Sequence, residues 1–202
     1  MAEPVPVALR NLKPRGWANW ALRRLGWKYD LQPPPEPRVV VIVYPHTSNW
    51  DFLWGILTRW GSGWPIRWVG KHSLFFWPVG GLLKNWGGVP VNRSATEGFV
   101  ENLAATIRQS DSMILSITPE GTRSYRDHWK SGFYRIAMAA DVPIGIGYID
   151  YATRTVGVSE YFRLTGDEAA DMVKIARAYE KMVARDPAKA APIRLRHDAQ
   201  KQ

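Results

Sequence analysis

Runs of apolar residues alternate with helical patterns along most of the chain. Arg38 to Tyr44 (RVVVIVY) is a continuous run rich in β-branched residues, which is typical of a strand buried on both faces. Shorter strands are predicted at 66–69, 88–91, 112–117 and 143–150, and helices at 49–60, 78–86 and 131–140. This alternation predicts an α/β fold: a single domain with a central, mostly parallel or mixed sheet flanked by helices.

Two further helices are indicated by capping boxes. Ser94 is followed three residues later by Glu97, and Thr165 is followed by Glu168. Apolar residues then recur at helical spacing, as Val100, Leu103, Ala104 and Ile107 after the first box, and as Met172, Ile175, Tyr179, Met182 and Val183 after the second. Each stripe predicts a helix with one face on the core.

A proline-rich segment, Gln32 to Pro37, divides the chain near its start. We therefore expect an N-terminal arm and linker over 1–37, a catalytic domain over 38–186 and a loose basic tail over 187–202. The arm contains a short amphipathic helix, predicted over 17–27. Its apolar face and basic rim are typical of a helix that lies in a membrane interface. The alternative is a helix that packs its tryptophans on the core.

Charge and aromatic content narrow the choice of partner. The formal net charge is +9, and 11 residues are tryptophan. A positive charge favours nucleic acid or an anionic lipid surface, and tryptophan suits the headgroup level of a membrane, although it also stacks on single-stranded bases. No strand shows the alternating aromatic and basic residues of RNA-recognition domains, so no nucleic acid is expected.

The membrane interpretation needs a surface-bound protein. No stretch of about 18 apolar residues lacks a charge or a breaker, so no transmembrane helix is predicted. Seven of the tryptophans fall between positions 50 and 86. Some of them must fill the core, and we expect segment 72–86 to face the membrane. The chain has no cysteine, which rules out a disulfide framework, cysteine zinc sites and a thiol nucleophile.

The first candidate for catalysis is the pair His46 and Asp51, which directly follows the buried strand. A histidine beside a carboxylate can act as a general base, because the carboxylate orients the ring and stabilises the imidazolium. The two can meet only if the chain turns at 47–49. The alternative is structural: Ser48 and Asp51 also form a capping box.

The second candidate is the segment Thr118 to Arg123 (TPEGTR), which follows another strand. A glycine between Glu120 and Arg123 suits a tight loop that presents both side chains, and arginine can bind phosphate through two parallel hydrogen bonds. The alternative is a surface turn with an internal ion pair. Arg93, at the exit of the strand 88–91, could share the same phosphate or be simply solvated.

In this order, the segments resemble the lysophosphatidate acyltransferase family (1-acylglycerol-3-phosphate acyltransferases). His46 and Asp51 match its H-x4-D motif, and 89–93 matches a short apolar strand that ends in arginine. Residues 119–123 match the end of F-P-E-G-T-R, with Thr118 in place of the aromatic residue. The V-P-[IV]-x-P motif is matched only at its start, because Ile146 stands where the second proline would be.

The resemblance implies transfer of a fatty acyl group from acyl coenzyme A or acyl carrier protein to the free hydroxyl of a lysophospholipid such as lysophosphatidate. His46 would be the base and Asp51 would orient it. Arg93, Glu120, Gly121, Thr122 and Arg123 would bind or shape the acceptor. No bound cofactor, metal or covalent acyl-enzyme is implied. We expect a peripheral protein on the anionic inner face of the cell membrane.

The departure at Ile146 leaves the acceptor open, so a lipid that bears an amine or a glycan is an alternative. A non-catalytic membrane- or nucleic-acid-binding module is a further one, against which the intact His46 and Asp51 argue. The acyl-chain length, the thioester carrier and the oligomeric state are not predicted.

Overall fold

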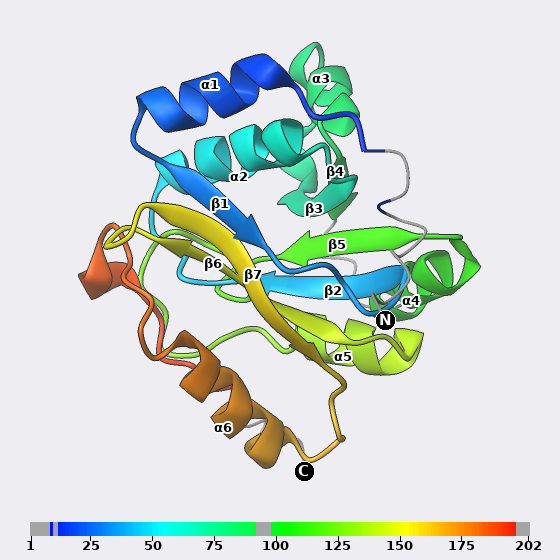
Figure 1. Cartoon of the computed structure of the whole chain (residues 1–202). Helices are drawn as coiled ribbons and strands as arrows, with labels where there is room; N and C mark the ends of the chain where they lie inside the picture. The colour runs from blue at the N-terminus through cyan, green and yellow to red at the C-terminus, as the bar shows by residue number, and fades with distance from the viewer. Residues whose placement is uncertain (1–8, 10–11, 92–97, 197–202) are drawn as a thin grey trace, which may run out of the picture.

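Seven strands form one mixed sheet in the order β1-β7-β6-β2-β5-β3-β4, as the computed structural model shows for residues 9, 12–91 and 98–196 (Figure 1). The strands are β1 (Lys28–Leu31), β2 (Arg38–Val43), β3 (Ile66–Lys71), β4 (Gly88–Val91), β5 (Met113–Ile117), β6 (Ile144–Asp150) and β7 (Thr155–Phe162). β6, β2, β5, β3 and β4 run parallel, whereas β7 is antiparallel to β6 and parallel to β1. The predicted α/β sheet is therefore confirmed as a mixed one.

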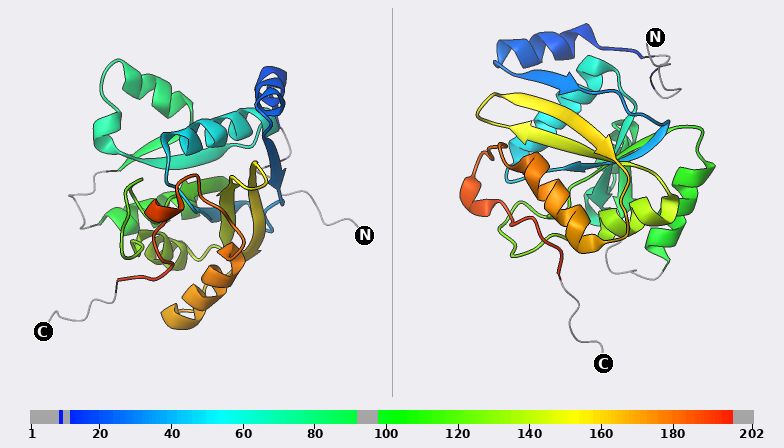
Figure 2. Two further views of the ribbon diagram at one scale, coloured as in Figure 1. Left: turned by 90° about the vertical axis from the view of Figure 1, so that its left-hand side faces the viewer. Right: turned by 60° about the horizontal axis from the view of Figure 1, so that its bottom comes forward.

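Helices cover both faces of the sheet (Figures 1 and 2). One face carries α1 (Gly16–Arg24), α2 (Asn49–Ser62) and α3 (Val79–Asn85), and the other carries α4 (Phe99–Gln109), α5 (Gly132–Ala140) and α6 (Glu168–Tyr179). The larger core lies under α4, α5 and α6, where their apolar stripes meet β2, β5 and β6. The α2 side instead has two smaller apolar clusters.

The predicted N-terminal arm is not separate from the rest of the domain. β1 pairs with β7 from Lys28 opposite Thr155 to Leu31 opposite Val158, and α1 packs on α2. The boundary expected at residue 38 was thus wrong, because the proline-rich segment is a loop between two strands of one sheet. The sequence patterns did not predict β7, the strand with which β1 pairs.

The predicted loose tail is also ordered as far as residue 196. Leu195 forms a bridge with Trp129, and a 3-10 turn occupies Pro187–Lys189. Leu195 and Ala191 are buried. The interpretation of 187–202 as a loose basic tail is therefore wrong for the residues that the structure describes, because apolar side chains anchor them to the domain.

The helix starts agree with the sequence only in part. α6 begins after Asp167, whose carboxylate accepts a hydrogen bond from the Ala170 amide at 3.0 Å, so Thr165 is not its cap. The capping box predicted at Ser94 and Glu97 lies outside the described residues. Among the described residues, no helix is long and apolar enough to cross a bilayer.

Candidate active site

The candidate site lies at the edge of the sheet where the parallel strands β2, β3 and β5 end. Ile42 of β2 pairs with Ile117 of β5, so the chain leaves both strands at the same level. His46 follows β2, and the loop after β5 contains residues 118–123. Loops beyond the carboxyl ends of parallel strands are where α/β proteins build their sites. The sheet thus brings the two sequence-predicted segments together.

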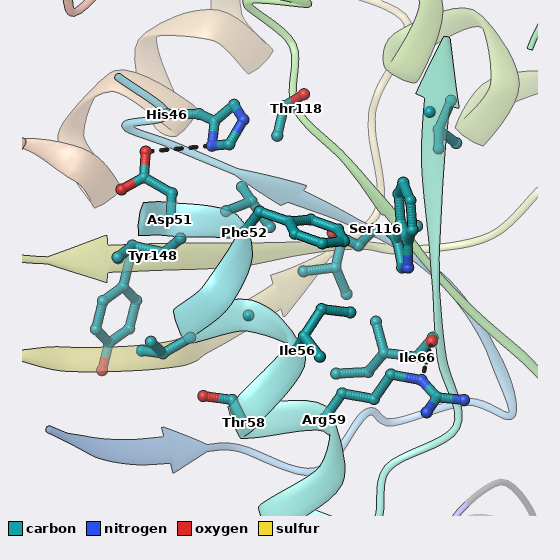
Figure 3. A pocket seen from close by; sticks show the side chains of 18 of the residues that line it. His46, Asp51, Phe52, Ile56, Thr58, Arg59, Ile66, Ser116, Thr118 and Tyr148 are labelled. Carbon is teal, nitrogen blue, oxygen red and sulfur yellow. Dashed lines mark hydrogen bonds and ion pairs between the residues drawn. The ribbon is translucent and has the colours of Figure 1, made fainter. Parts of the chain in front are cut away.

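His46 and Asp51 face each other across the turn between β2 and α2. His46 Nδ1 lies 3.3 Å from Asp51 Oδ2 and is buried, with no other partner among the described residues (Figure 3). The distance is that of an ion pair, although the ring is not aligned for a full hydrogen bond. Catalytic hydrogen bonds are often loose before substrate binds. The second ring nitrogen points away from Asp51, toward the side of Thr118.

Asp51 also caps α2, so its structural interpretation is confirmed and is compatible with the predicted pairing with His46. Asp51 Oδ2 accepts a hydrogen bond from the Ser48 amide at 2.8 Å, and Ser48 Oγ accepts one from the Trp50 amide at 3.2 Å. This capping box turns the chain between His46 and Asp51. The cap is therefore what directs the carboxylate back to the imidazole.

Tyr151 is a third member of this group that the sequence analysis missed. Its hydroxyl donates a hydrogen bond to Asp51 Oδ1 at 2.6 Å and accepts one from Trp54 Nε1 at 3.2 Å. Tyr151 directly follows β6, which ends at the same edge of the sheet as β2. That position was the available signal, but nothing in the sequence pairs Tyr151 with Asp51.

Burial alone would raise the pKa of Asp51. The adjacent His46 imidazole, the hydrogen bond from Tyr151 and the one from the Ser48 amide outweigh it, so the pKa lies below its usual value. Asp51 is therefore ionised wherever His46 can act as a base. Tyr151 shares the carboxylate with the imidazole, which makes it a positioning residue.

We expect Tyr151→Phe to move the acid limb of the pH profile of kcat/KM to higher pH, because Asp51 loses one of the hydrogen bonds that hold its pKa below the usual value. The acid limb is obtained from kcat/KM values measured over a range of pH. Tyr161→Phe is the control, since Tyr161 donates instead to the Gln32 carbonyl. An unchanged acid limb in Tyr151→Phe would show that Tyr151 does not act through the pair.

Glu120 occupies a different position from the one expected. Its side chain is 1% exposed and does not line the cavity described below. Oε2 accepts a hydrogen bond from the His46 amide at 2.7 Å, and Oε1 accepts one from the Ala191 amide at 3.1 Å. The prediction that Glu120 binds or shapes the acceptor site is corrected for binding: both of its oxygens accept backbone hydrogen bonds, which hold the His46 loop and the C-terminal segment together.

Burial raises the pKa of Glu120 to about 7, against the two amide hydrogen bonds that lower it. A carboxyl group whose pKa is higher in the folded than in the unfolded protein destabilises the fold as pH rises through that window. We therefore expect the difference in melting temperature between wild type and Glu120→Gln, in favour of wild type, to decrease from about pH 5 to about pH 8. Each kcal/mol of stability lost by wild type lowers its melting temperature by roughly 2–4 °C. Calorimetry across this range tests it, and a constant or growing difference would contradict it.

The segment 121–123 forms the loop that was predicted. Gly121 has a φ of +64°, a left-handed backbone conformation that favours glycine, and a Cβ there would come 3.1 Å from the flexible Lys130 side chain. Thr122 Oγ1 accepts a hydrogen bond from the Ser124 amide at 3.3 Å. Arg123 is exposed and reaches the cavity. Arg93 lies outside the described residues.

A cavity of about 520 Å³ extends from His46 beneath α2. It is lined by His46 and Asp51, by Gly121, Thr122 and Arg123, and by four further cationic side chains, Arg59, Lys71, Arg126 and Lys130. Farther in, its wall is largely apolar, with Val41, Val43, Phe52, Ile56, Ile66, Trp68 and Ile114 (Figure 3). Its size is typical of sites for small organic ligands.

The pair and the cavity define the chemistry that the site can perform. A histidine held by a carboxylate can take a proton from a hydroxyl, the cations can bind an anionic group, and the apolar wall can hold a hydrocarbon chain. No group of three or more histidine, aspartate or glutamate side chains within 12–91 and 98–196 is placed to hold a metal ion.

Comparisons with known proteins bear on the family and the fold of this chain. A family model described as Acyltransferase matches residues 28–145. The crystal structure of the 1-acyl-sn-glycerophosphate (LPA) acyltransferase PlsC from Thermotoga maritima is similar over 81% of this chain and 76% of that chain, with 18% identity and a TM-score of 0.53. At this identity the likeness shows the fold. No curated protein sequence matches the chain.

Proposed function

The chain belongs to the acyltransferase family, and from that premise we propose that it moves a fatty acyl group from an acyl thioester to the free hydroxyl of a lysophospholipid. The observation that carries this proposal is the His46–Asp51 pair at the mouth of a cavity that is basic outside and apolar inside. A lysophosphatidate molecule has one phosphate and one free hydroxyl, which match the cations and the base.

The reaction needs one proton carrier. His46 removes the proton from the acceptor hydroxyl, and the oxygen attacks the thioester carbonyl carbon. A carbon–oxygen bond forms, the carbon–sulfur bond breaks, and the imidazolium returns its proton to the leaving thiolate. Asp51 keeps the ring oriented and stabilises its charged form throughout. The chain has no cysteine, which agrees with direct transfer without a thiol intermediate.

The two halves of the cavity suit the two parts of the reactants. Arg123 is charged and exposed at the mouth, where it can bind the acceptor phosphate with two parallel hydrogen bonds. The acyl chain of the thioester fits the apolar part beneath α2, where burial of each methylene is favourable by about 0.8 kcal/mol. Coenzyme A and acyl carrier protein are both possible carriers of the thioester.

A lysophospholipid has to be reached at a membrane, and one surface of the protein suits that task. We define the tryptophan surface as the exposed large apolar side chains of segments 17–25 and 74–82: Trp17, Trp20, Leu25, Leu74, Phe76, Trp77, Val79 and Leu82. Trp20 is 67% and Trp77 is 91% exposed. Arg23, Arg24 and Lys84 accompany them. Exposed aromatic residues with a basic rim favour an anionic bilayer surface, here the inner face of the cell membrane.

Replacement of Trp20 and Trp77 by serine is expected to weaken binding to anionic phospholipid vesicles at least tenfold, because burial of one large apolar side chain contributes about 1.5–3 kcal/mol. Co-sedimentation with the vesicles measures it. Val173→Ser is the control, since Val173 is 53% exposed on α6, at the opposite end of the molecule (Figure 1). Equal binding by the double variant and wild type would contradict the membrane role of this surface.

The function is tested by a screen of donors against acceptors. Purified protein is mixed with acyl thioesters of several chain lengths, on coenzyme A or acyl carrier protein, and with lysophosphatidate, an amine-bearing lysolipid or a glycan lipid. We expect release of free thiol that depends on lysophosphatidate. Release that depends only on the amine or glycan lipid would assign the same chemistry to that acceptor. Absence of release from every pair would overturn the proposal.

A further inference from the structure

Hydroxyl groups interrupt the apolar wall of the cavity beneath α2. Thr58 on α2 is 2% exposed and lines the cavity, yet its Oγ1 has no hydrogen-bond partner among the described residues (Figure 3). Ser116 on β5 and Tyr148 on β6 line the cavity as well, and neither hydroxyl bonds to a described residue. The cavity therefore offers hydrogen bonds in a region that a plain hydrocarbon chain could not use.

An unpaired buried hydroxyl is costly, and native proteins rarely leave one. Thr106 on α4 shows the usual solution in the same molecule: its Oγ1 donates to the carbonyl of Asn102, four residues back, at 2.8 Å. Thr58 is also inside a helix but does not bond to the carbonyl four residues back. Its hydroxyl is thus left available to a molecule in the cavity.

The helix fixes how far Thr58 lies from Asp51 along α2. Thr58 follows Asp51 by seven residues, which places it on the same side of α2 about 10 Å farther along the helix axis. Arg59, beside it, also lines this inner end, where its Nε donates to the Ile66 carbonyl at 2.8 Å. A chain whose thioester carbon lies at His46 and which runs beneath α2 therefore brings its distal half to Thr58 and Arg59.

We propose that the acyl group transferred by this protein carries a hydroxyl in its distal half, and that Thr58 is the residue that selects it. This inference rests on the proposed acyl transfer and specifies its donor. The hydroxyl of the chain would donate to, or accept from, Thr58 Oγ1, with Ser116, Tyr148 and Arg59 as further polar groups in the same wall. Thr58 would thus determine specificity without touching the reacting atoms.

The test compares matched pairs of acyl-coenzyme A thioesters of equal chain length, one saturated and one with a hydroxyl in the distal half, such as decanoyl and ω-hydroxydecanoyl. We expect wild type to favour the hydroxylated donor in kcat/KM by about threefold to tenfold, the contribution of one hydrogen bond. Thr58→Val keeps the shape and removes the hydroxyl. It should abolish the preference, because the hydroxyl that distinguishes the two donors is gone.

Thr106→Val is the matched control, because it removes a helical threonine hydroxyl remote from the cavity and should leave the preference intact. Melting temperatures check that both variants fold. Equal kcat/KM for both donors in wild type, or a preference that survives in Thr58→Val, would overturn the inference and leave acyl transfer standing, with water as the partner of these hydroxyls. Failure of both donors together with every donor of the wider screen would instead overturn the proposed function.

Discussion

Replacement of His46 by alanine is expected to lower kcat for acyl transfer by about a hundredfold to ten-thousandfold, the usual contribution of a general base. Among the described residues, His46 is the only histidine that lines the cavity. Asp51 lies 3.3 Å from its Nδ1. Without the imidazole, the acceptor hydroxyl has to lose its proton to water. Release of free thiol in the presence of a lysophospholipid measures the rate.

A second histidine–aspartate pair supplies the control for this experiment. His128 Nδ1 lies 2.6 Å from Asp127 Oδ1, closer than His46 lies to Asp51, but the pair does not line the cavity. His128→Ala should therefore keep wild-type turnover. Melting temperature verifies that His46→Ala folds. Wild-type turnover in folded His46→Ala would contradict the mechanism.

Replacement of Arg123 by alanine is expected to lower kcat/KM for lysophosphatidate by about tenfold to a hundredfold, because a hydrogen bond to a charged group contributes about 1.5–3 kcal/mol. Arg123→Lys should recover only part of the loss, since lysine keeps the charge but cannot form two parallel hydrogen bonds. The same variants assayed with an acceptor that lacks the phosphate should differ little from wild type.

Arg135 provides the matched control for Arg123. It is an exposed arginine on α5 that does not line the cavity, so Arg135→Ala removes the same charge from the molecule as a whole. We expect it to leave kcat/KM for lysophosphatidate unchanged. An Arg123→Ala variant that loses equal activity with both acceptors would show that Arg123 supports the loop and does not bind phosphate.

The fold was predictable from the sequence where a pattern is local. The β-branched run of β2 is continuous and the apolar stripes of α4 and α6 are periodic, and each belongs to the expected kind of element. α6 nevertheless ends at Tyr179, before Met182 and Val183 of the predicted stripe. β7 was missed, and with it the pairing of β1, because β7 lies between β1 and β6 and only these distant partners define it as a strand. The C-terminal segment was misjudged for a similar reason: its charges are local, but the burial of Ala191 and Leu195 depends on distant residues.

The site was predictable to the extent that residues adjacent in the sequence perform the chemistry. His46 and Asp51 belong to one turn, and their spacing shows in the sequence. Glu120 was assigned to the acceptor because the sequence shows its loop but not the direction of its side chain. The carboxylate points inward to two backbone amides, and no feature of the sequence distinguishes this from an outward direction. Tyr151 follows a predicted strand, but nothing in the sequence pairs it with Asp51. Thr58 has no sequence signal, since only the packing of α2 on the sheet places it at the cavity.

The central claim is that His46 activates a lipid hydroxyl for direct attack on an acyl thioester. The most direct measurement incubates the protein with an acyl thioester, in the presence and in the absence of lysophosphatidate. Mass spectrometry then quantifies the free thiol and the acylated lipid. The account predicts that one thiol and one acylated lipid appear in equal amounts, that neither forms without lysophosphatidate, and that His46→Ala forms almost none. Thiol release that proceeds without the acceptor, or product formation by His46→Ala at the wild-type rate, would contradict it.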